Sequence, residues 1–179
     1  MRILDLNKET TSNILESLLK RSPNSYGEYE SRVAAIIEEV RKNRDAAVSY
    51  TKQFDRAEIN ADNIVVTDEE INEAYATVAP ELLDVIRKSL VNIRAFHSKQ
   101  LQNSWFTSGE NGTILGQKVT PLDKVGVYVP GGKAVYPSSV LMNIVPAKVA
   151  GVKTIVMTTP PGKDGKVNPA TLVAAKEAG

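Results

Sequence analysis

The chain has no cysteine and only one histidine among its 179 residues. The absence of cysteine excludes disulfide bonds and thiolate chemistry within this sequence. Zinc sites in proteins draw mostly on histidine and cysteine ligands. A complete zinc site built from this sequence alone is therefore not expected.

The chain also lacks a strong net charge and a long apolar run. Lys and Arg number 22 against 21 Asp and Glu, a formal charge of +1, which gives no case for nucleic acid or an anionic membrane as the main partner. No apolar run approaches the ~20 residues of a membrane span, and Met1–Asp5 does not open a signal peptide. The hydrophobic share of 42% is ordinary for a soluble globular protein. The sequence therefore predicts a cytoplasmic chain of one domain or two small ones.

The strongest pattern lies between Val125 and Thr159. The β-branched and aromatic run Val125–Val129 predicts a buried strand, and Lys153–Thr158 predicts a second one. Between them, a Pro-Gly-Gly loop is followed by apolar residues at helical spacing. A strand–helix–strand unit has parallel strands and a right-handed crossover, so the pattern predicts an α/β fold with a parallel sheet. Ligands of such sheets bind beyond the carboxyl ends of the strands, where Tyr128 and the Pro-Gly-Gly loop lie.

Proline shapes the prediction for the crossover between these strands. Pro146 would break a long helix, so we predict two short helices, about 138–143 and about 146–150. Gly151 is expected to end the second helix as a C-cap residue.

The patterns in the rest of the chain predict mostly helices. Residues 1–22 are predicted to form an arm, followed by a linker at Ser22–Ser25. The pattern stops at Gly179, where an α/β unit would turn into its next strand, so we expect the chain to be the front part of something longer. The other predicted features are amphipathic helices around 33–40 and 43–54, a strand at 63–66, a capping box of Thr67 and Glu70, a helix from Pro80 to about Gln102, a hairpin at Asn111-Gly112 and a last helix from Asn168.

The whole chain resembles one enzyme family. The stretch Val125–Asn143 closely resembles the signature region of histidinol dehydrogenases, and Pro146–Val152 continues the match. Further matching motifs are Phe54-Asp55, Ile93-Arg94-x-Phe96-His97-x-x-Gln100, Leu115-Gly116-Gln117 and Thr159-Pro160-Pro161.

The resemblance implies an NAD-linked, zinc-dependent oxidoreductase of histidine biosynthesis. Such an enzyme oxidises L-histidinol to L-histidine through L-histidinal, as a cytoplasmic homodimer with incomplete Rossmann-like domains. The implied division is an N-terminal helical arm (1–22), an opening segment of a first α/β domain (23–129) and a truncated opening segment of a second, Rossmann-like domain (130–179). The family's zinc ligands, its catalytic Glu-His pair and most substrate contacts lie later in its chain. The fragment alone is therefore expected to be inactive.

The resemblance carries only cofactor-binding residues onto this sequence. Tyr128 matches the family tyrosine that contacts NAD, and Pro130, Gly131 and Gly132 match the adjoining loop. No catalytic and no metal-binding residue is assigned.

Other interpretations remain open for these residues. By residue type alone, Tyr128 is more often a core strand residue, and Gly131-Gly132 more often a tight turn. His97 is expected to be packed or hydrogen-bonded rather than a metal ligand, since the position four residues on is Leu101. The alternative function is a non-catalytic nucleotide-binding or assembly module, because an unfinished sheet leaves an apolar face or a strand edge exposed.

Overall fold

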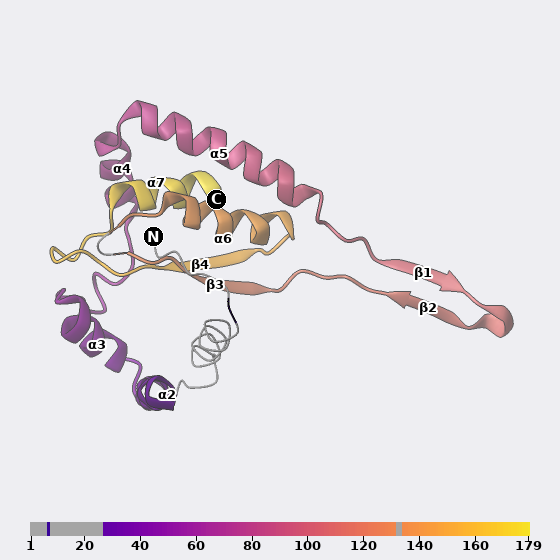
Figure 1. Cartoon of the computed structure of the whole chain (residues 1–179), viewed down its shortest axis with the longest axis horizontal. Helices are drawn as coiled ribbons and strands as arrows, with labels where there is room; N and C mark the ends of the chain where they lie inside the picture. Colours follow the sequence, from indigo (N-terminus) through magenta and orange to yellow (C-terminus); the bar gives the residue numbers. More distant parts are fainter. Residues whose placement is uncertain (1–6, 8–26, 132–133) are drawn as a thin grey trace. The chain divides into compact units, whose positions relative to one another are not determined.

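The structure is a computed structural model that describes Asn7 and residues 27–131 and 134–179 (Figure 1). The predicted arm and linker lie outside the described residues. The chain divides into two compact units, Met1–Ala47 and Val48–Gly179. The predicted domain limits at residues 22 and 129 remain predictions.

The first unit contains α2, Gly27–Lys42. This helix confirms the amphipathic pattern around residues 33–40. Helix α3, Ala46–Asp55, begins at the boundary between the units and confirms the helix predicted at 43–54.

The second unit is built on a parallel pair of strands. Strand β3, Lys124–Tyr128, pairs with β4, Thr154–Thr158, and α6, Pro137–Val149, connects the two. The register places Tyr128 opposite Thr158 at the carboxyl ends of both strands. The predicted α/β unit with parallel strands is confirmed.

A layer of helices covers one face of this sheet. Helices α4 (Asp68–Thr77), α5 (Pro80–Ser98) and α7 (Pro169–Ala178) form it together with α6, and Figure 1 shows α5, α6 and α7 on one side of the strands. Alternate residues of a strand point to opposite faces. The core therefore takes one set of β3 and β4 side chains, and the other set is exposed. The fully buried large side chains are Val129, Val140, Leu141, Val145 and Val173.

Helix α6 is continuous through Pro146, so the prediction of two short helices is wrong. A proline inside a helix costs about 3 kcal/mol, because it removes one hydrogen bond and crowds the preceding turn. Four apolar residues of α6 are buried (Val140, Leu141, Ile144 and Val145). Each is worth about 1.5–3 kcal/mol, so their packing outweighs the proline. The helix ends at Val149 with Ala150 as its C-cap, one residue before the C-cap predicted at Gly151, which follows at φ 90°.

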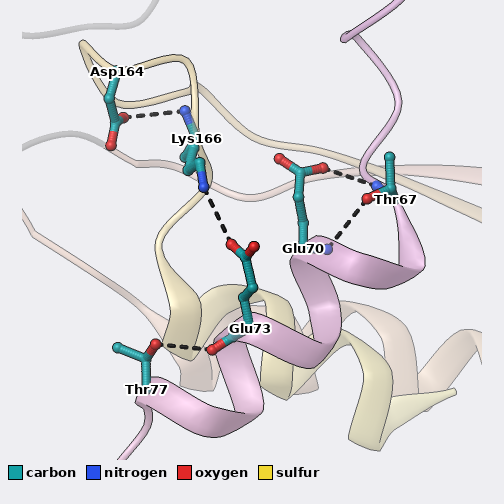
Figure 2. A network of polar contacts seen from close by, with 6 residues as sticks. All are labelled: Thr67, Glu70, Glu73, Thr77, Asp164 and Lys166. Carbon is teal, nitrogen blue, oxygen red and sulfur yellow. Dashed lines mark hydrogen bonds and ion pairs between the residues drawn. The ribbon is translucent and has the colours of Figure 1, made fainter.

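The segment that leads into α4 shows one confirmed and one wrong prediction. Thr67 Oγ1 accepts a hydrogen bond from Glu70 N at 3.2 Å, and Glu70 Oε2 accepts one from Thr67 N at 2.9 Å, which confirms the capping box (Figure 2). The predicted strand at 63–66 is a turn and bend instead. Asn63 Oδ1 accepts from Asn60 N at 2.6 Å, and this local bond holds the chain in the turn.

The predicted hairpin follows α5. Strands β1, Trp105–Ser108, and β2, Ile114–Gln117, are antiparallel, with a short 3-10 turn, η1 (Glu110–Gly112), between them. Asn111 and Gly112 have φ of 65° and 78°, the left-handed conformation that this dipeptide favours. In the described part of the chain, no helix is long and apolar enough to cross a membrane.

Candidate functional site

Tyr128 stands at the carboxyl end of β3 and is 61% exposed. Its neighbours Val127 and Val129 are 8% and 0% exposed, because they point into the core on the opposite face. The backbone continues the ladder past the strand, with Val129 N donating to Thr158 O at 2.9 Å. The interpretation of Tyr128 as a core residue is therefore wrong. Its ring and hydroxyl are available at the sheet edge where ligands of parallel sheets bind.

The loop after β3 packs closely against the loop after β4. Gly131 is exposed to solvent, yet a Cβ added to it would lie 3.2 Å from Pro160 O and 3.4 Å from Thr159 Oγ1. A side chain at this position would require Pro160 to move by a few tenths of an ångström. This close contact favours a glycine at position 131. Pro130 is exposed beside it, and Gly132 lies outside the described residues.

A cavity of about 340 Å³ is lined in part by the same loops. Its lining includes Val135, Pro160 and Asn168, so it joins the loop after β3, the loop after β4 and the start of α7. Nearby, α6 begins at Pro137 with Tyr136 as its N-cap, and no side chain caps this end. Pro137 has no N–H and Ser139 N already donates to Tyr136 O at 3.0 Å, so the helix dipole, more than free N–H groups, would favour an anion here. This end of the sheet thus combines an aromatic ring, a cavity and a helix start.

His97 lies away from this edge, in the last turn of α5. Its Nδ1 is 2.6 Å from Gln100 Oε1, and the ring packs edge-on against Phe96. The expected hydrogen-bonded role is confirmed. Its Nε2 is buried and, among the described residues, has no hydrogen-bond partner. A cavity of about 280 Å³ beside it is lined by Leu101, Pro121 and the end of α6.

A polar network that the sequence did not reveal joins three helices. Glu177 of α7 accepts hydrogen bonds from Tyr75 of α4, at 2.8 Å, and from two nitrogens of Arg87 of α5, at 2.9 and 3.0 Å. Burial, together with the bond to Glu177, raises the pKa of Tyr75 to about 12. The hydrogen bonds from Arg87 hold the pKa of Glu177 below its usual value, although burial opposes them. The network ties the helical layer together.

Comparison with known proteins decides the family. The family model for histidinol dehydrogenase matches residues 19–179. The chain belongs to the histidinol dehydrogenase family. Curated relatives include histidinol dehydrogenase of Bacillus subtilis, 54% identical over 96% of this chain, and that of Heliobacterium mobile, 56% identical over 83%. A crystal structure of histidinol dehydrogenase from Elizabethkingia anophelis matches 84% of the chain with a TM-score of 0.77 and 36% identity.

The chain spans only part of the length of its relatives. It covers 40% of the Bacillus subtilis histidinol dehydrogenase and 34% of the Elizabethkingia anophelis chain. In the part of the chain that the structure describes, no group of three or more His, Cys, Asp or Glu side chains is placed to hold a metal ion. The described residues therefore do not fit the zinc ion that the family resemblance implies.

Proposed function

We propose that this chain supplies one edge of the NAD site of a histidinol dehydrogenase. The supporting observation is the exposed Tyr128 at the carboxyl end of a parallel strand, beside Pro130 and Gly131 of the following loop. Gly132, the next residue in the sequence, belongs to the same proposal by resemblance to the family. Tyr128 offers a flat face to a ring and a hydroxyl to a ribose or phosphate. NAD, when bound, supplies the acceptor for the hydride that leaves the substrate.

The reaction proposed for the full-length enzyme is the oxidation of L-histidinol to L-histidine through L-histidinal. Family membership supports this proposal. It also supports the proposals of a homodimeric state and a cytoplasmic location. The residues of this chain would hold the cofactor, and none of them is assigned a proton-transfer or metal-binding role. We therefore propose that the chain by itself binds NAD weakly and does not oxidise histidinol.

NAD binding to Tyr128 can be tested on the chain itself. NAD is titrated into the wild-type chain and the Tyr128→Ala variant, and binding is followed by saturation-transfer NMR. Loss of one aromatic contact should weaken binding by roughly three- to tenfold. Tyr29→Ala is the matched control, since Tyr29 is 66% exposed on α2 and lies in the other unit. Equal affinities of the Tyr128 and Tyr29 variants would contradict the proposal.

Activity is tested separately. The purified chain is incubated with NAD, zinc and L-histidinol, and NADH is measured by its absorbance. We expect no NADH, because general acid–base chemistry needs a positioned group of suitable pKa. NADH formation that follows the chain through purification would show that the fragment is active.

A further inference from the structure

The β1–β2 hairpin exposes large apolar side chains on both of its faces. Cross-strand partners share a face, so Trp105 and Leu115 lie on one side and Phe106 and Ile114 on the other. These four side chains are 54%, 62%, 66% and 70% exposed, in that order. All eight strand residues are exposed. Figure 1 draws the hairpin beyond the last turn of α5.

Such a hairpin needs a partner. A two-stranded hairpin is marginally stable in water by itself, and a contiguous exposed apolar surface marks an interaction site. The hairpin has some support of its own, because the Phe106 ring lies so close to Gly116 that any Cβ there would collide with it. Trp105 Nε1 also donates to Gln117 Oε1 at 3.3 Å. These contacts fix the register and leave both apolar faces uncovered.

The cavity beside His97 lies at the base of the hairpin. Its lining includes Leu101 and Gln102, which lead into β1, and Val119 and Thr120, which follow β2. The buried Nε2 of His97 lies beside this cavity without a partner among the described residues. A segment that covers the hairpin would therefore also contact this cavity at its base.

The length of the relatives identifies the occupant. Most of the Bacillus subtilis relative and most of the Elizabethkingia anophelis chain have no counterpart in this sequence, although the fold of this chain is found within the Elizabethkingia anophelis structure. A second copy that packed its hairpin against this one would bury one face of each and leave the other face exposed. A larger polypeptide segment can cover both faces.

We propose that the hairpin is a docking arm, which the part of the histidinol dehydrogenase chain outside the present sequence clamps on both faces. Where one polypeptide carries both parts, the segment binds the hairpin of its own chain. When the segment is supplied as a separate polypeptide, it binds the hairpin of this chain. The proposal rests on family membership and does not depend on NAD binding.

The test is co-expression of this chain with the part of the Bacillus subtilis relative that lies outside their match. Trp105 is the only tryptophan of the chain, so it reports on the hairpin directly once tryptophans of the added segment are replaced by phenylalanine. We expect a complex of one chain with one segment by light scattering. Emission from Trp105 should move to shorter wavelength, and acrylamide should quench it less.

Variants on each face test the clamp. Phe106→Ser and Leu115→Ser each remove one exposed apolar side chain, and each should weaken the complex roughly tenfold or more. Val91→Ser is the control, because Val91 is 67% exposed on α5 and lies away from the hairpin. Ile114→Thr repeats the test on the Phe106 face with a residue that strands accept readily. Circular dichroism checks that each variant keeps the helical layer.

Other outcomes would overturn the proposal. If no complex forms, or if both hairpin variants bind as the control does, the hairpin is not the docking site. If only one face matters, the clamp on both faces is wrong. If the chain alone self-associates and shields Trp105, the occupant is a second copy. None of these readouts involves NAD, so failure here is distinct from failure of the Tyr128 titration.

Discussion

Removing the Glu177 carboxylate should lower the free energy of unfolding by about 2 kcal/mol, because a hydrogen bond to a charged group contributes about 1.5–3 kcal/mol. Glu177 holds α4 and α5 against α7 through three hydrogen bonds of 2.8, 2.9 and 3.0 Å. Its side chain is only 14% exposed, so water replaces these bonds poorly. The Glu177→Ala variant therefore leaves the Tyr75 hydroxyl and the Arg87 guanidinium without their acceptor.

Two effects keep the loss well below the sum of three such bonds. The Arg87 side chain is 52% exposed, so the guanidinium regains water when its partner is removed. Glu177 also lies in the last turn of α7, where a negative charge opposes the helix dipole by about 0.3–1 kcal/mol. Removing the charge removes this unfavourable interaction, which offsets about 0.3–1 kcal/mol of the loss in stability. The remaining loss is about 2 kcal/mol.

The assay is urea unfolding followed by circular dichroism, with amide exchange in α7 as a local measure. The control is Glu73→Ala, which breaks the bridge between Glu73 Oε2 and Lys166 Nζ at 3.2 Å (Figure 2). That pair also joins distant parts of the sequence, but its side chains are 68% and 61% exposed. Exposed pairs contribute about 0–1 kcal/mol. Equal losses in the two variants would refute the reasoning, since burial would then make no difference.

Acid should remove the stabilisation that the Glu177 carboxylate provides. The pKa of Glu177 in the folded chain lies below its ordinary value of 4.5. Stability from this group is therefore present above pH 4.5 and is lost as the pH falls through the lower folded value. The Glu177→Gln variant cannot titrate, so its loss of stability relative to wild type should shrink as the pH falls. A difference that stays constant down to acid unfolding would contradict this sign.

Three further predictions concern stability. Thr67→Ala removes the N-cap of α4 and should lower the free energy of unfolding in urea by about 1 kcal/mol. Thr77→Ala should lower it by less, because the Thr77 hydroxyl only donates to a carbonyl of its own helix. Leu141→Ala should cost about 2–5 kcal/mol because Leu141 is 1% exposed, whereas Leu122→Ala, at 69% exposed, should stay within about 0.5 kcal/mol. Alkali should destabilise the chain as the pH rises from 10.0 through about 12, because folded Tyr75 keeps a proton that the unfolded chain has lost, and Tyr75→Phe should abolish this step.

Features decided by neighbouring residues could be predicted from the sequence. The capping box at Thr67 and the hairpin at Asn111 each depend on side chains a few positions apart. The N-cap at Asn168 is of the same kind, with its Oδ1 accepting from Ala170 N at 2.9 Å. The parallel strands were also predictable, because both are short apolar runs bounded by Pro or Gly.

Features decided by tertiary packing could not be predicted. Pro146 carries a strong local signal against a helix, but burial of the residues before it outweighs that signal. The apolar residues Ile64 and Val65 resemble a strand, yet they are 55% and 71% exposed. The network at Glu177 joins residues up to 102 positions apart, and no motif links them.

The position of Tyr128 could be predicted from the sequence, whereas its surroundings depend on what covers the exposed face of the sheet. Parallel sheets are normally covered on both faces. Val156 is apolar, 63% exposed and opposite Gly126 in the middle of the strands, where a Cβ added to Gly126 would meet nothing within 4 Å. A layer of protein is therefore expected over this middle part. Tyr128 pairs with Thr158 at the very end of both strands, next to the loop of Gly131. A layer centred on Val156 leaves that end at its margin, so a covered sheet is compatible with the proposed contact between Tyr128 and NAD.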